Sequence, residues 1–94
     1  MSSRKRSQPE LAEIRACILR YLDAAGPRGL AAGPVRANLV AEGWILDLDE
    51  VERELLYLED RGLVRRLVRP ISHAVPRWTL TADGRDELAA GSAV

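Results

Sequence analysis

The sequence predicts a mainly α-helical domain with one small β-hairpin, and three observations support this fold class. The helical segments 8–25, flanked by Ser7 and Gly26, and 47–62 each have a capping signal, an apolar face at helical spacing and a closing glycine. Residues 63–81 contain two strand-like segments around a polar turn. A chain of 94 residues with 47% apolar composition is sufficient for a single small core.

The first helix is expected over about residues 8–25. Ser7 and Glu10 have the spacing of a capping box, and Gly26 ends the apolar pattern. Residues 1–8 are polar and basic and predict a flexible arm; because no apolar run follows them, they do not resemble a signal peptide. The face expected to enter the core contains Leu11, Ile14, Ile18, Tyr21 and Leu22, with Cys17 and Ala25 beside them.

A shorter second helix is expected over about residues 33–42. The preceding loop, PRGLAAGP, places Leu30 in either a very short strand or a packed turn. Gly43 is suited to the left-handed residue after the helix, and the connector of residues 44–46 is expected to fill the junction with the third helix. The predicted apolar stripe of the second helix consists of Val35, Leu39 and Val40.

The third helix, within residues 47–62, has the strongest signal in the chain. Asp47 and Glu50 repeat the capping-box spacing, and Gly62 supplies the stop. Its core positions are predicted to be Leu48, Val51, Leu55 and Leu58, with Leu56 at the edge.

Two strands and a last helix are expected after Gly62. The first strand covers residues 63–69 and places Arg65 and Arg66 on opposite faces, because neighbouring side chains of a strand alternate. In the second strand Pro76, Trp78 and Leu80 share one face, and Arg77, Thr79 and Thr81 share the other.

The turn between these strands is the segment PISHA. Thr79 or Thr81 is able to cap a short helix over about residues 82–90, and residues 91–94 form a frayed tail. The folded domain therefore spans residues 8–90.

Two segments carry a resemblance to a known family. LLYLEDRGLVRR (residues 55–66) resembles the end of the third helix and the first wing strand of MarR- and PadR-type regulators. WTLTADGRDEL (residues 78–88) resembles their second wing strand and the helix that follows it. Small phage and mobile-element proteins of this size look similar.

The resemblance covers about residues 8–90 and implies a winged helix-turn-helix fold. This fold has a three-helix core, a two-stranded wing and a short C-terminal helix. The resemblance further implies sequence-specific binding of duplex DNA in transcriptional control, usually as a dimer.

The charges are unevenly distributed along a chain whose net charge is zero. Residues 1–20 carry five basic and two acidic groups, and residues 47–61 carry seven acidic and two basic groups. Residues 62–78 contain four arginines and no acid. Any electrostatic attraction to DNA must therefore come from a local patch.

In a helix-turn-helix protein the helix before the wing enters the major groove. Its expected surface here consists of Asp49, Glu50, Arg53, Glu54 and Tyr57. Carboxylates accept hydrogen bonds from the cytosine amino group, and Arg53 is suited to guanine, but three carboxylates beside DNA phosphates are unfavourable. The other interpretation is a solvated acidic face, whose first turn is stabilised by the helix dipole.

The wing and the arm offer better DNA contacts. The wing candidates are Arg65, Arg66, Arg69, His73 and Arg77, which could contact phosphates or enter a minor groove. Arg4, Lys5 and Arg6 form a candidate minor-groove arm. The alternatives are a ribbon edge kept soluble by charge and an ordinary charged terminus.

No residue pattern indicates an enzyme, a cofactor, a metal site, a small-molecule ligand or a membrane span. One His and one Cys, far apart in the chain, form neither a metal site nor a catalytic dyad, and a lone Cys suggests a reducing cytoplasm. Two functions follow. The first is a DNA-binding regulator that uses wing and arm; the second is a protein-interaction module that docks a basic partner or homodimerises.

Overall fold

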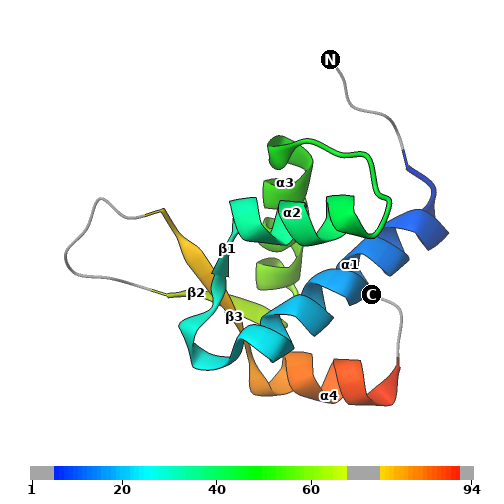
Figure 1. Cartoon of the computed structure of the whole chain (residues 1–94). Coiled ribbons are helices and arrows are strands. Elements are labelled where there is room, and N and C mark those ends of the chain that lie inside the picture. Colours follow the sequence, from blue (N-terminus) through cyan, green and yellow to red (C-terminus); the bar gives the residue numbers. More distant parts are fainter. Residues whose placement is uncertain (1–5, 68–74, 92–94) are drawn as a thin grey trace.

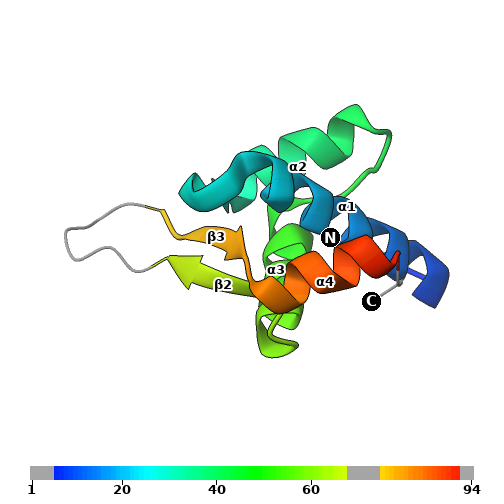
Figure 2. The same ribbon diagram turned by 90° about the horizontal axis from the view of Figure 1, so that it is seen from below.

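The computed structural model describes residues 6–67 and 75–91. Figure 1 shows three helices packed together, a hairpin that extends to one side, and a last helix that packs against the first. Figure 2 shows the same hairpin and the last helix from below. In chain order the elements are α1 (Gln8–Ala25), the 3-10 turn η1 (Gly26–Arg28), β1 (Leu30–Ala31), α2 (Ala32–Ala41), α3 (Leu48–Asp60), β2 (Val64–Leu67), β3 (Arg77–Leu80) and α4 (Ala82–Ala90).

Both predicted capping boxes are confirmed. At α1 the Ser7 hydroxyl accepts from the backbone N–H of Glu10 at 3.3 Å, and the Glu10 carboxylate accepts from the N–H of Ser7 at 3.0 Å. At α3 Asp47 and Glu50 make the same pair of bonds at 2.9 and 3.2 Å. Each box satisfies backbone donors that a helix start leaves free, so the sequence fixes where these two helices begin.

The sheet has three antiparallel strands in the order β1-β3-β2. Leu30 pairs with Trp78, so the predicted alternative of a very short strand is correct. Gly29 precedes this strand with φ +67°, and a Cβ there would collide with the carbonyl oxygen of Trp78. The close approach of β1 to β3 therefore requires a glycine.

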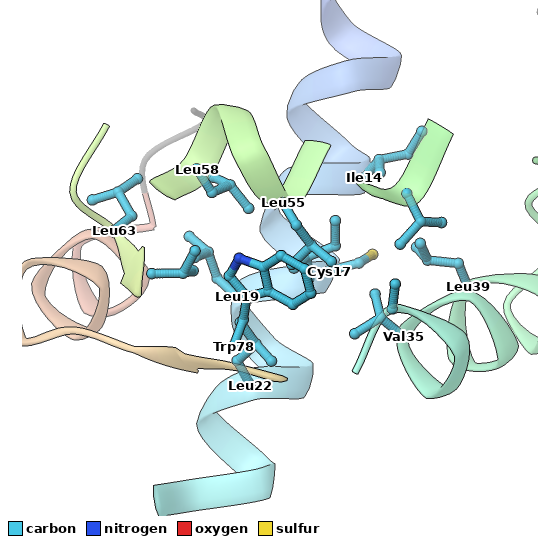
Figure 3. Close-up of a cluster of buried hydrophobic side chains, with 14 of the residues drawn as sticks. Ile14, Cys17, Leu19, Leu22, Val35, Leu39, Leu55, Leu58, Leu63 and Trp78 are labelled. Carbon is cyan, nitrogen blue, oxygen red and sulfur yellow. The ribbon is translucent and has the colours of Figure 1, made fainter. Parts of the chain in front are cut away.

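The core is aliphatic around one buried tryptophan, Trp78. Figure 3 shows Trp78 of β3 between side chains of α1, α2 and α3. The fully buried residues are Ile14, Ile18, Leu19, Leu22, Val35, Leu39, Val51, Leu55, Leu58 and Val64.

The prediction of burial is wrong for three apolar residues. Val40, Ile45 and Leu48 are 46%, 82% and 43% exposed. Val35 and Leu39, one turn apart, bury the face of α2, which turns the adjacent Val40 outward. Leu46 is 5% exposed and fills the junction before α3, so its neighbour Ile45 points to solvent.

The end of α3 is joined directly to the start of α4. The Thr81 hydroxyl accepts from the N–H of Gly84 at 3.0 Å and donates to the carbonyl of Gly62 at 2.7 Å. Thr81 is therefore the helix cap, whereas the Thr79 hydroxyl donates to the carbonyl of Gly26 at 3.3 Å. A Cβ at Gly84 would collide with the carbonyl oxygen of Leu63, which explains the glycine in the segment TLTADG.

Candidate nucleic-acid interface

The helix before the wing, α3, presents two different charged faces. Residues three or four positions apart in a helix share a face. Glu50, Glu54 and Tyr57 therefore lie along one side of α3. The other side carries Asp49, Arg53, Leu56 and Asp60, all of which are exposed.

The first of these sides is covered by α1. The Arg15 Nε donates to Glu54 Oε1 at 2.6 Å, and the two side chains are only 10% and 14% exposed. The same guanidinium lies 3.7 Å from the centre of the Tyr57 ring, at cation–π distance. Arg61 extends the contact, because its Nη1 donates to the Tyr57 hydroxyl at 2.8 Å.

Arg6 is held against the start of the same helix. Its Nε lies 3.1 Å from Glu50 Oε2, and its Nη2 donates to the carbonyl of Ile45. The guanidinium also lies 5.9 Å from the centre of the Trp44 ring. With a side chain that is 7% exposed, Arg6 anchors the chain and is not part of a free arm, contrary to the sequence-based expectation.

The predicted α3 surface is therefore split. Glu50, Glu54 and Tyr57 are turned toward basic groups of α1 and of the segment before it. Asp49 and Arg53 remain on the outward face. Within the described residues, Arg53 has no ion-pair or hydrogen-bond partner. The rotation of α3 about its own axis, which depends on tertiary packing, decides which of these side chains face outward.

The wing arginines differ from one another in their surroundings. Arg65 and Arg66 leave opposite faces of β2, as predicted from their adjacent positions. Arg66 pairs with Glu59 at 2.8 Å and lies 5.6 Å from the centre of the Trp78 ring. Arg77 is half-buried, and its Nε has no hydrogen-bond partner within the described part of the chain. The other basic candidates, Arg4, Lys5, Arg69 and His73, lie outside the described residues.

Cys17 is buried, as the apolar face of the first helix predicted, and is 2% exposed. It joins α1 to the end of α2: the Arg20 Nη2 lies 3.0 Å from the Cys17 sulfur, which lies 3.5 Å from Glu42 Oε1. Burial raises the pKa of the Cys17 thiol, so the thiol stays protonated and unreactive near neutral pH.

The described residues contain no group of three or more His, Cys, Asp or Glu side chains able to hold a metal ion. None of their helices is long and apolar enough to cross a membrane.

Sequence reasoning missed Arg15 as a residue of this region. It lies within the first helix between buried aliphatic residues, and Glu54 is 39 positions away. No local pattern links the two. The one signal in the sequence is an arginine placed among the apolar positions Ile14 and Ile18 of the first helix. This signal does not indicate which residue the arginine contacts.

The structure is similar to two solved regulators. No protein-family model matches the chain, and no curated protein sequence matches it. A point mutant of S. aureus MepR, a MarR-family winged-helix regulator, is 22% identical with a TM-score of 0.68; the match covers 88% of this chain and 60% of that one. The ferric uptake regulator from Francisella tularensis, solved with iron, is 23% identical with a TM-score of 0.60, covering 87% and 57%.

These matches span less than two thirds of either regulator. Both neighbours are transcription regulators and not enzymes. The likeness confirms the winged helix-turn-helix fold and the predicted resemblance to MarR-type domains.

Proposed function

We propose that this domain is a DNA-binding transcription regulator that places the outward face of α3 in the major groove and its wing on the DNA backbone. The observation that carries the proposal is the pairing of Glu50 with Arg6 and of Glu54 with Arg15. These pairs lessen the main objection to DNA binding, the acidity of α3, although Asp49 and Asp60 remain exposed on its outward face.

Electrostatic repulsion between carboxylates and DNA phosphates decides whether α3 can enter the groove. Duplex DNA carries one phosphate charge per about 1.7 Å of its axis, so each uncompensated carboxylate in the groove opposes binding. With Glu50 and Glu54 neutralised by arginines, Asp49 is the acid of the predicted surface that remains outward, beside Arg53, which has no ion pair within the described residues. Arginine is the side chain best suited to guanine in the major groove.

The wing supplies the proposed phosphate contacts through Arg65, Arg66, Arg69, His73 and Arg77. The ion pair between Arg66 and Glu59 does not prevent this role. Its side chains are 45% and 31% exposed, and such pairs contribute little stability. Arg66 can therefore exchange Glu59 for a phosphate at small cost.

The arm has a changed role in this proposal. Arg6 fixes the chain beside the N-terminal end of α3, which is the end that contacts base edges in helix-turn-helix proteins. Arg4 and Lys5 immediately precede this anchor in the sequence. We therefore assign DNA contact to Arg4 and Lys5 and positioning to Arg6.

Titration of a labelled duplex with the protein, followed by fluorescence anisotropy at several salt concentrations, tests this function. We expect binding that weakens steeply with salt, because each phosphate contact releases a counterion. A protein that does not bind duplex DNA in the high-micromolar range at low salt would contradict the proposal.

One observation favours a second function, docking of a basic protein partner or of a second copy. Ile45, Leu48 and Leu56 are 82%, 43% and 47% exposed around an acidic helix surface. Exposed apolar residues ringed by charge are typical of protein interfaces. Light scattering measures self-association directly, and a monomer that binds duplex DNA tightly would rule out docking as the main role.

A further inference from the structure

A pocket lies on the side of the sheet where the wing meets the body of the domain. It has a volume of about 430 Å³, which is large enough for a small metabolite. The end of α1, the 3-10 turn η1, strands β2 and β3, and the first turn of α4 contribute its walls. Residues from five elements therefore converge on one space.

Two arginines line this pocket. Arg65 comes from β2 and Arg85 from α4, and both are exposed. Within the described residues neither has an ion pair or a hydrogen bond to its side chain. This differs from Arg6, Arg15 and Arg66, each of which is paired with a glutamate.

The start of α4 adds further donors. Ala82, the first residue of this helix, lines the pocket, and Thr81 caps the backbone N–H of Gly84. The first N–H groups of a helix have no acceptor within it, and the helix dipole favours an anion at this end. The cap leaves the N–H of Ala82 available.

The remaining walls combine apolar side chains with two threonines and one acid. Leu22, Pro27 and Leu80 line the pocket, so a ligand that fills it has an organic part. Asp23 also lines it, and the ionisable lining therefore carries a net charge of one positive unit. A bare inorganic ion would leave the apolar part of the pocket empty.

We propose that this pocket binds a small phosphate monoester. Arg65 and Arg85 would hold the phosphate from two elements, with the first turn of α4 as a third donor. Guanidinium groups match phosphate oxygens in charge and in planar hydrogen-bond geometry. The apolar side chains would cover the organic part.

This assignment goes beyond DNA binding and has a regulatory consequence. Arg65 is also one of the wing arginines proposed to contact DNA. An occupant that engages Arg65 would withdraw it from the DNA backbone, so the ligand and DNA would compete for one side chain. Occupancy of the pocket is thereby expected to weaken DNA binding.

The test is a titration of the full chain with phenyl phosphate, inorganic phosphate and acetate, followed by backbone amide chemical shifts. We expect phenyl phosphate to bind most tightly, with shifts centred on Arg65, Ala82 and Arg85. Arg85→Gln should weaken binding by about tenfold. Asp23→Asn should tighten it by about threefold, because it removes a repelling charge.

If the affinity for phenyl phosphate falls in Arg85→Gln and rises in Asp23→Asn, general unfolding cannot explain both changes. Shifts centred elsewhere, equal binding of acetate, or no change in Arg85→Gln would each overturn the assignment. The phosphate titration does not require DNA, so its result stands separately from that of the DNA titration.

Duplex DNA provides the second arm of the experiment. We expect Arg85→Gln to bind a labelled duplex as the unmodified protein does. A weaker affinity together with a salt slope reduced by about one would show that the pocket holds a backbone phosphate of DNA, and it would overturn the small-molecule assignment.

Discussion

The two charged faces of α3 contain the same kinds of residue in opposite situations. On the face toward α1, Glu50 and Glu54 each pair with an arginine at 3.1 and 2.6 Å. On the outward face, Asp49 and Arg53 are exposed and, within the described residues, have no ion pair. The difference shows that the charge of a helix, counted along its sequence, does not give the charge of the surface it presents.

Burial decides what each pair contributes. The pair between Arg15 and Glu54 is largely shielded from water, whereas the pair between Arg66 and Glu59 at the wing is 45% and 31% exposed. Exposed pairs contribute up to about 1 kcal/mol, and removal of one partner from a buried pair costs several times more. The α1-facing side of α3 is therefore structural, and the outward side is available for binding.

The largest expected effect comes from breaking the structural face. Arg15→Ala leaves Glu54 nearly buried without its donor and removes the contact with Tyr57. We expect a loss of about 2 kcal/mol in the free energy of unfolding. Urea denaturation of the variant and of the unmodified protein measures this loss.

A double-mutant cycle separates this interaction from other effects of the substitution. Arg15→Ala and Glu54→Ala should show a coupling energy of at least about 1 kcal/mol. The matched control is Asp49→Ala with Arg53→Ala, four positions apart on the outward face, which should be additive within about 0.5 kcal/mol. Additive behaviour at Arg15 and Glu54 would show that their contact does not stabilise the fold.

These two faces also mark the limit of prediction from the sequence. The helix starts were predicted because capping boxes join residues only three positions apart, such as Asp47 and Glu50. The strand alternation that separates Arg65 from Arg66 is equally local. Local signals thus gave the order of the elements and most of their limits.

The rotation of α3 was not predictable in the same way. It depends on contacts between residues 39 and 44 positions apart, Arg15 with Glu54 and Arg6 with Glu50. Periodicity alone also placed Leu48 in the core, although it is the first residue of the helix and lies half exposed. The outward surface of a helix becomes known only once its packing partners are known.

The second effect, in order of size, concerns the outward face. Arg53→Ala should weaken binding of the preferred duplex by about tenfold, because one good contact to guanine contributes about 1–3 kcal/mol. Stability should change by less than about 0.5 kcal/mol, since Arg53 is exposed and makes no ion pair within the described residues. Anisotropy titrations and urea denaturation measure the two quantities, with Arg85→Gln as the control outside the proposed interface. If the variant loses stability but keeps its DNA affinity, Arg53 stabilises the fold and does not contact DNA.

The smallest expected effect compares neighbouring acids on the two faces. Asp49→Asn removes a carboxylate from the outward face, and we expect it to tighten DNA binding by about threefold, because that carboxylate repels nearby phosphates. Glu50→Gln removes an equal charge one position away, but that carboxylate already pairs with Arg6, so DNA affinity should change less.

The loss of folding stability should have the reverse order. Asp49→Asn loses only part of a helix-dipole interaction, about 0.5 kcal/mol, whereas Glu50→Gln also releases Arg6 and should cost more. Equal changes in DNA affinity from both substitutions, measured at one salt concentration, would mean that DNA senses only the total charge of α3 and that its two faces do not differ in function.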